Sequence, residues 1–197
     1  MKKLRLGVVV LAAGLSRRMG DENKLTKAFK DRPLVSHVAE MVSRLEAEDV
    51  VVVVGHQQDQ VSAALSDFSH LRCVTNLEFH TGMASSLELG VSELNEEIDA
   101  FLVCLGDMPL VTKSDVTQLL DIFDAKVDPI VIPTFQGKRG NPVLWANTYR
   151  KNFENLSGDR GAKALFRKYS DRIVEVEVGG DGILKDFDDP ESFKASV

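Results

Sequence analysis

The sequence contains few cysteines, and the two that it has show no metal-binding spacing. Cys73 and Cys104 are the only ones among 197 residues. This usage gives no support for a zinc site or a disulfide framework and is typical of a reducing compartment. We interpret both residues as reduced structural thiols and expect a cytoplasmic protein.

A long hydrophobic run is also missing. Basic residues precede the first apolar stretch, as they do in a signal peptide, but the stretch reaches only Ala13. A membrane-spanning helix needs about 20 apolar residues. The residues from Gly7 onward are needed for the loop described below, so we expect neither a signal peptide nor a membrane span.

The chain has no excess of positive charge. Its formal net charge is −6, yet residues 2–30 contain eight basic and two acidic side chains, which leaves a net charge of −12 for the rest. An acidic chain with one basic segment is expected to bind a small anionic ligand rather than a nucleic-acid polymer. The alternative is that the basic segment is a solvated surface.

Two common phosphate-binding motifs are absent. The apolar residues 6–10 lead into Leu-Ala-Ala-Gly-Leu-Ser-Arg-Arg-Met-Gly (residues 11–20), and Lys24 follows. No Lys-Ser/Thr pair follows the glycines, and no Gly-x-Gly-x-x-Gly follows the strand, which excludes a P-loop and a dinucleotide motif. Backbone N–H groups of such a loop converge on polyanions. We predict a phosphate-binding loop; the alternative is an ordinary strand-to-helix turn with a basic face.

Short β-branched runs alternate with helical patterns along the chain. The expected strands are residues 6–10, 50–54, 72–75, 100–105, 129–132 and 173–178. The expected helices are residues 34–45, with Pro33 in the first turn, and residues 58–65, 84–94 and 114–123, the last capped by Thr112 or Ser114. The alternation predicts an α/β protein with a doubly wound, mostly parallel sheet and helices on both faces.

The last third of the chain departs from this pattern. After Thr134 we expect a glycine-containing hairpin or excursion and then a helix to about Leu156. Since no linker, repeat or low-complexity segment divides the chain, we expect residues 1–197 to form a single domain.

Asp107 follows the expected strand at residues 100–105, in the sequence Leu-Gly-Asp-Met-Pro. Ligands of an open parallel sheet bind beyond the carboxyl ends of the strands. Mg²⁺ prefers one or two carboxylates together with phosphate oxygens and water. Asp107 is therefore the first candidate metal ligand, and the alternative is an Asp that only caps the next turn.

The loop at residues 11–20 and the Leu-Gly-Asp-Met-Pro sequence together resemble the MobA-like nucleotidyltransferases, which join a nucleoside monophosphate to a phosphorylated acceptor. The resemblance extends from Leu6 to about Phe193. It implies a Rossmann-like fold of the nucleotide-diphospho-sugar transferase type, with Arg18, Lys24 and Asp107 as catalytic residues. It also implies nucleotide binding by Leu11, Ala12, Ala13, Gly14, Ser16, Arg18, Gly20 and Lys24.

Leu-Ala-Ala-Gly looks like the molybdenum cofactor cytidylyltransferase branch of this family. That branch implies CTP as the nucleotide, the molybdopterin cofactor as the acceptor, and transient contact with a molybdenum hydroxylase. Mg²⁺ or Mn²⁺ is the implied metal. One alternative is an enzyme of the same fold that transfers another nucleotide such as GMP, or that uses a sugar-phosphate or isoprenoid acceptor. Another is a non-catalytic maturation factor that binds the cofactor.

Four further segments match the family. Asn76 and the Gly-Met-x-x-Ser-Leu sequence imply nucleotide binding by Asn76, Gly82, Ser85 and Ser86, although Ser85 and Ser86 are equally well explained as helix caps. Gly140–Leu144 and residues 157–162 imply acceptor binding by Asn141 and Asp159, and a simple turn before a helix explains Asp159 equally well.

The fourth segment lies near the C-terminus. Asp186 and Asp188 lie in Asp-x-Asp-Asp-Pro-Glu, where the family usually has Asp-x-Asp-Thr-Pro-Glu-Asp. The resemblance implies that one of them completes the metal shell. Their alternation places both on one side of an extended segment. A solvated acidic tail is the alternative.

The expected reaction requires no general base, because an acceptor phosphate is already largely dianionic near neutral pH. Charge neutralisation by the loop, Arg18, Lys24 and a metal at Asp107 is expected to supply the catalysis. No histidine is assigned a catalytic role.

Overall fold

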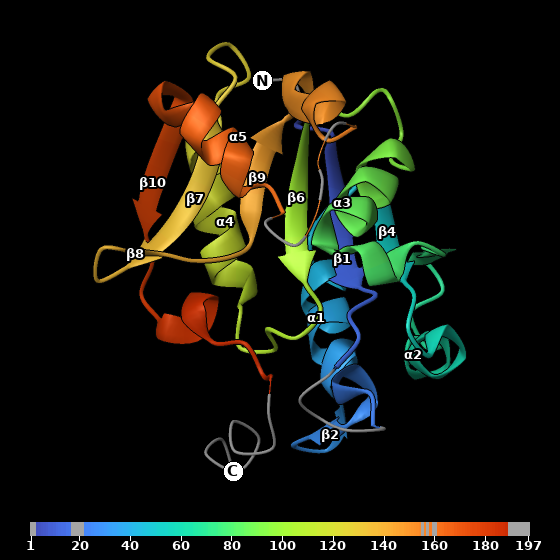
Figure 1. Cartoon of the computed structure of the whole chain (residues 1–197). Coiled ribbons are helices and arrows are strands. Elements are labelled where there is room, and N and C mark those ends of the chain that lie inside the picture. The colour runs from blue at the N-terminus through green and yellow to red at the C-terminus, as the bar shows by residue number, and fades with distance from the viewer. Residues whose placement is uncertain (1–2, 17–21, 155, 157, 159–160, 189–197) are drawn as a thin grey trace.

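A computed structural model describes residues 3–16, 22–154, 156, 158 and 161–188 of the chain. Its strands are β1 (Leu6–Ala12), β2 (Ala28–Phe29), β3 (Arg32–Pro33), β4 (Asp49–Val54), β5 (Arg72–Thr75), β6 (Ala100–Leu105), β7 (Ile130–Phe135), β8 (Lys138–Arg139), β9 (Val143–Ala146) and β10 (Ile173–Glu177). All but β2 and β3 form one eight-stranded sheet in the order β10-β7-β9-β6-β1-β4-β5, with β8 paired to β7 (Figure 1). β2 and β3 pair with each other.

Five α-helices are described, α1 (Leu34–Ser43), α2 (Gln58–Ala64), α3 (Met83–Ser92), α4 (Lys113–Ile122) and α5 (Lys163–Lys168). Short 3-10 helices are η2 (Lys24–Thr26), η3 (Phe79–Thr81), η4 (Asn147–Asn152), η5 (Ser170–Arg172) and η6 (Asp181–Leu184). None of the described helices is long and apolar enough to cross a membrane.

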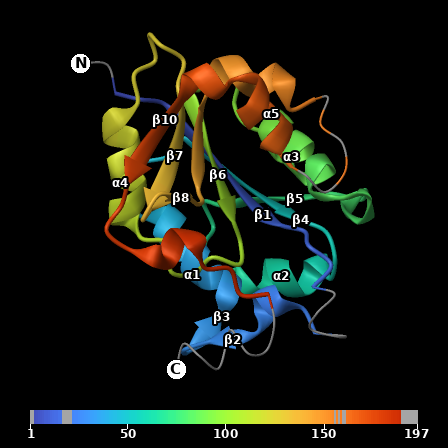
Figure 2. The ribbon, with the colours of Figure 1, turned by 60° about the vertical axis from the view of Figure 1, so that its left-hand side comes forward.

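Both faces of the sheet are covered, as the uninterrupted apolar strands predict. Val8 and Val10 of β1 pack into one hydrophobic core with residues of α1, α2 and α4. Val9, between them, points to the opposite face and packs into a second core with residues of α3 and α5. Figure 2 shows these two groups of helices on opposite sides of the strands. The predicted doubly wound α/β architecture is confirmed.

Helix α3 lies unusually close to the sheet. A Cβ atom on Gly90 would lie 2.8 Å from Cγ2 of Val53 and closer still to Val9. Only glycine fits this contact without displacing a buried valine.

The start of α1 differs in detail from the sequence prediction, whereas the start of α4 agrees with one of its two alternatives. Pro33 is the N-cap residue of α1 and lies outside its first turn. Helix α4 has a complete capping box, in which Thr112 accepts from the Asp115 N–H and the Asp115 side chain accepts from the Thr112 N–H. This pairing selects Thr112 over Ser114 as the cap.

The segment after Thr134 contains the expected hairpin, made by β7 and β8. The prediction of a helix that ends near Leu156 is wrong. A 3-10 helix over Asn147–Asn152 takes its place. Strand β9 precedes it and lies antiparallel between β6 and β7. Its Trp145 is buried against the rings of Phe101 and Phe153, so packing in the second core, rather than helix periodicity, determines this segment.

Both cysteines are free, but only one is part of the core. Cys104 in β6 is buried, and burial raises the pKa of its thiol to about 12. Cys73 is exposed on β5, the strand at the edge of the sheet. The interpretation of Cys73 as a structural thiol is therefore wrong, because its side chain on the edge strand stays accessible to solvent.

Candidate active site

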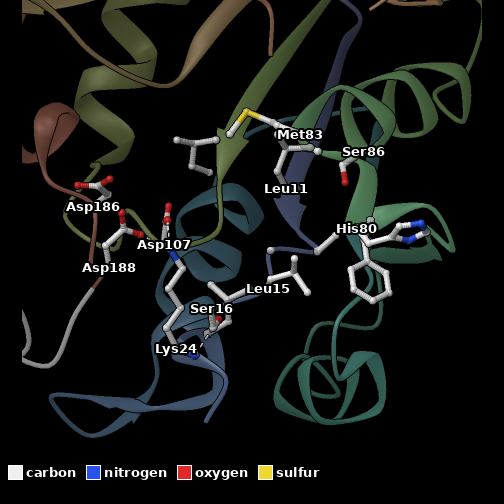
Figure 3. Close-up of a pocket in the computed structure, with 16 residues that line it drawn as sticks. Leu11, Leu15, Ser16, Lys24, His80, Met83, Ser86, Asp107, Asp186 and Asp188 are labelled. Atoms are coloured by element: carbon white, nitrogen blue, oxygen red, sulfur yellow. Dashed lines mark hydrogen bonds and ion pairs between the residues drawn. The ribbon is translucent and has the colours of Figure 1, made fainter. Parts of the chain in front are cut away.

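A cavity of about 470 Å³ lies at the carboxyl ends of β1 and β6 (Figure 3). The cavity lining includes these predicted site residues: Leu11, Ala13, Gly14, Ser16, Lys24, Gly82, Ser86, Asp107, Asp186 and Asp188. Charged groups gather at one side of it, and Leu15, His80 and Met83 lie toward the other (Figure 3). The cavity therefore offers a polar side and a largely apolar side to one ligand.

The loop after β1 is held by a small hydrogen-bond network. The Ser16 hydroxyl accepts from the backbone N–H of Lys24 at 3.2 Å and donates to Asn23 Oδ1 at 3.4 Å. Asn23 also accepts from the Leu25 N–H, which caps η2, and donates to the His56 carbonyl. The network fixes the backbone from which the Lys24 side chain enters the cavity. Asn23 is a buried part of this site that the sequence analysis did not single out; its N-cap position before η2 was the available signal.

Lys24 makes the central ion pairs of the cavity. Its Nζ lies 2.5 Å from Asp107 Oδ2 and 2.5 Å from Asp188 Oδ1. Burial alone lowers the pKa of the Lys24 amine, but the two carboxylates outweigh this effect and leave the pKa above its usual value. Lys24 is therefore a cation throughout the neutral range. Arg18 and Gly20, predicted from the same loop, lie outside the described residues.

Asp107 is positioned by the end of β6. The N–H of Gly106 donates to the Leu11 carbonyl at 2.9 Å, and a Cβ on Gly106 would lie 2.9 Å from the same oxygen. The second carboxylate oxygen of Asp107, Oδ1, is buried and has no hydrogen-bond partner among the described residues. A buried carboxylate oxygen without a donor is a free ligand position for a cation.

Asp186 and Asp188 reach the same side of the cavity from the C-terminal segment. The pKa of the Asp186 carboxyl is raised, first by burial and then by the negative charges of Asp188 and Asp107. The described residues hold no ready cluster of three or more His, Cys, Asp or Glu side chains for a metal. The arrangement fits a cation that takes one or two carboxylates from the protein and further oxygens from a phosphate ligand, as Mg²⁺ does.

Asn76 and Ser85 support the cavity wall from behind. Asn76 is buried, and its Nδ2 donates to the hydroxyls of Ser85 and Ser86 at 2.9 Å each. Its Oδ1 accepts from the Glu78 N–H at 2.8 Å. Of these residues only Ser86 lines the cavity. The helix-cap interpretation of the two serines is not supported, because the start of α3 has no side-chain cap.

Two other predicted site residues do not line the cavity. Ala12 is buried at the end of β1. Asn141 donates its backbone N–H to the Ile183 carbonyl at 2.9 Å and borders a separate, much smaller cavity. Asp159 lies outside the described residues, but its neighbour Gly158 accepts from the Ala84 N–H at 3.1 Å and so contacts the start of α3.

Known proteins match part of this sequence. The chain is 36% identical over 119 residues to the bifunctional protein GlmU of Bordetella parapertussis, a match that covers 58% of this chain and 26% of GlmU. The chain thus spans about a quarter of the length of several curated relatives.

Solved structures share the fold over nearly the whole chain. Rv0371c of Mycobacterium tuberculosis has a TM-score of 0.84 at 22% identity, and the match covers 100% of this chain and 98% of the Rv0371c chain. A manganese complex of Rv0371c has a TM-score of 0.74 at 19% identity, and the match covers 91% of this chain and 90% of the Rv0371c chain. A nucleotidyl transferase of Methanothermobacter has a TM-score of 0.84 at 19% identity, and the match covers 97% of this chain and 95% of the transferase chain.

A family model described as the MobA-like NTP transferase domain matches residues 8–173. This range contains the loop after β1, Lys24 and Asp107, and the fold is that of the nucleotide-diphospho-sugar transferases. The chain belongs to the MobA-like NTP transferase family.

Proposed function

We propose that this nucleotidyltransferase transfers CMP from CTP to the terminal phosphate of the molybdopterin cofactor and releases pyrophosphate. The observation that carries the proposal is the single cavity in which the Lys24 ammonium meets Asp107, Asp186 and Asp188. A triphosphate needs a fixed cation and a place for a divalent metal, and this side of the cavity offers both.

The proposed reaction is an in-line displacement. An oxygen of the acceptor phosphate forms a bond to the α-phosphorus of CTP, and the bond from that phosphorus to the bridging α–β oxygen breaks. The electron pair of the broken bond leaves with pyrophosphate. The nucleophile is already anionic, so no side chain has to remove a proton.

Lys24 stabilises the negative charge that spreads over the phosphate oxygens in the transition state. Its low exposure, 12% of the side chain, keeps water from weakening that interaction. We assign Arg18 the same task from the neighbouring part of the loop. The backbone N–H groups after Ala13 provide further donors.

Mg²⁺ or Mn²⁺ is the proposed cofactor, with Asp107 and either Asp186 or Asp188 as its protein ligands. When bound, the ion neutralises charge on the triphosphate and orients it for displacement. The unpartnered Oδ1 of Asp107 supports this assignment.

The preference for cytidine rests on Ala13. Its methyl group lies at the cavity wall beside Gly55, where an added Cβ would come within 2.9 Å of it. Phe79 lies against the same glycine and lines the same wall. A crowded wall favours a pyrimidine over a purine, although one methyl group discriminates weakly.

The setting of the reaction is part of the same proposal. We assign residues 1–197 to one catalytic domain that works in the cytoplasm, binds neither a nucleic-acid polymer nor a membrane, and passes its product to a molybdenum hydroxylase by transient contact.

Incubation with each of the four nucleoside triphosphates, Mg²⁺ and molybdopterin tests the proposal through pyrophosphate release. We expect release with CTP and molybdopterin together and not with either alone. Preferential release with GTP would identify a guanylyltransferase instead. Release only with sugar phosphates would identify a different acceptor, and binding without release would identify a cofactor-binding maturation factor.

A further inference from the structure

We propose that Phe187 is a positioning residue that fixes the carboxylates of Asp186 and Asp188 at the cavity. The inference rests on the proposed function, because it assigns both carboxylates to the reaction site. It concerns a residue that touches no ligand and acts through its two neighbours in the chain. We call residues 181–188, which contain these three, the strap.

Phe187 anchors the strap by its side chain. The ring is 2% exposed, whereas the residues on either side line the cavity. It packs edge-on against the ring of Phe29, with centroids 4.8 Å apart at 68°. Because side chains alternate along an extended segment, burying Phe187 turns both neighbouring carboxylates the other way, toward the cavity.

The backbone of Phe187 provides a second anchor. Its N–H donates to the backbone carbonyl of Asp107 at 3.1 Å. This bond ties the strap directly to the loop that carries the third carboxylate. Asp188 is therefore held next to Asp107 by a contact within the strap as well as by the shared ion pairs with Lys24.

The start of the strap is also fixed. The Ile183 carbonyl accepts from the Asn141 N–H at 2.9 Å. A Cβ on Gly182 would lie within 2.8 Å of the Leu110 backbone carbonyl carbon and closer to its oxygen. The strap is thus held at η6 and again at Phe187, and Asp186 lies between the two anchors.

Phe29 connects this anchor to the segment that carries Lys24. It is 3% exposed in β2, and its ring packs edge-on against His37 of α1 with centroids 5.2 Å apart. His37 Nε2 also lies 2.8 Å from the Phe29 carbonyl oxygen. The contact between the buried rings of Phe29 and Phe187 therefore joins the segment that carries Lys24 to the strap, which carries its ion-pair partner Asp188.

The carboxylates need such an anchor because they repel one another. Asp107, Asp186 and Asp188 share one side of the cavity with a single described ammonium, that of Lys24. Like charges at short range favour separation of the segments that carry them. A buried ring opposes that separation without adding a charge of its own.

The test compares Phe187→Leu with Phe153→Leu. Phe153 is 1% exposed and packs edge-on against Phe101 and Trp145 in the second core, so it matches Phe187 in burial and ring geometry. Mn²⁺ binding with a non-hydrolysable CTP analogue, followed by electron paramagnetic resonance, gives a readout that needs no acceptor. Thermal unfolding of each variant measures the structural cost alone.

We expect Phe187→Leu to weaken Mn²⁺ binding about tenfold, as the loss of a residue that orients a metal ligand does. Phe153→Leu should lower the melting temperature by a similar amount and change Mn²⁺ binding less than about twofold, because leucine there disturbs only the second core. In an Asp186→Asn/Asp188→Asn background, Phe187→Leu should cause no further weakening.

Equal Mn²⁺ affinity of the Phe187→Leu variant and the unaltered protein would overturn the positioning role, as would equal weakening in both leucine variants. A protein that releases pyrophosphate but binds no Mn²⁺ would also overturn it, while leaving the proposed nucleotidyl transfer intact. Conversely, the expected Mn²⁺ result without transfer to molybdopterin would support the strap and contradict the proposed acceptor.

Discussion

The ammonium group of Lys24 lies within 2.5 Å of the Asp107 carboxylate, although 83 residues separate the two in the chain. The parallel pairing of β1 with β6 produces this contact, because it brings the loops after the two strands to the same edge of the sheet. The cation to which we assign phosphate binding and the carboxylate to which we assign metal binding thereby share one wall of the cavity.

Removal of the Lys24 charge should abolish most turnover. We expect Lys24→Ala to lower the rate of pyrophosphate release by roughly 10²-fold or more, as the loss of one transition-state donor does. The same loss is expected for Arg18→Ala. Lys113→Ala, which removes an exposed lysine of α4, is the matched control and should retain full activity. Undiminished turnover of the Lys24 variant would exclude the role assigned to its ammonium.

Asn76→Ala should destabilise the wall of the cavity. The substitution removes two donated hydrogen bonds and leaves the Glu78 N–H without its acceptor. Loss of a buried hydrogen-bonding group costs about 1–3 kcal/mol in the free energy of unfolding, which urea denaturation measures. Asn152→Ala, on the half-buried end of η4, is the comparison, and a similar cost at both sites would argue against a special role for Asn76.

Glu177 should make the fold sensitive to acid. Its pKa is lowered, first by the hydrogen bond from Thr134 Oγ1 and then by the backbone N–H of Gln136. A carboxyl with a lower pKa in the folded state stabilises that state above its unfolded pKa, and the stabilisation is lost as the pH falls through the folded value. The melting temperature of Glu177→Gln should therefore lie below that of the unaltered protein at pH 7, and the difference should shrink toward pH 3. A difference independent of pH would rule out the ionised carboxylate as its source, and the exposed Glu154→Gln serves as control.

The two cysteines should react very differently with a thiol reagent. Cys73 is exposed, although partial burial also raises the pKa of its thiol. Cys104 is buried, and burial raises its pKa to about 12, which removes the reactive thiolate at neutral pH. We expect one rapidly titrated thiol in the native protein and two after unfolding. Cys73→Ser should abolish the rapid reaction, and rapid labelling of that variant would contradict the buried position of Cys104.

The sequence was sufficient to predict β1, β4, β5 and β6, because uninterrupted β-branched runs such as Val50 to Val54 favour strands that are covered on both faces. It was also sufficient to predict that Lys24 and Asp107 lie at the same edge of the sheet. Both conclusions follow from hydrophobic pattern and from the geometry of parallel strands.

Other features depend on contacts between distant segments and could not be predicted. Strand β9 is short, and only its insertion between β6 and β7 stabilises it. The burial of Asn76 and the pairing of Phe187 with Phe29 likewise join residues whose spacing has no local periodicity. Local patterns carry no information about such partners.

The position of the strap also has a consequence for biosynthesis. The loop after β1 leaves the ribosome well before the strap, and Asp186 and Asp188 emerge only after every described strand has been made. Domains generally fold as units as they emerge, N-terminal parts first. A nascent chain that has completed the described sheet still lacks part of the negative wall of the cavity, so translation itself delays the completion of this wall until the strap docks.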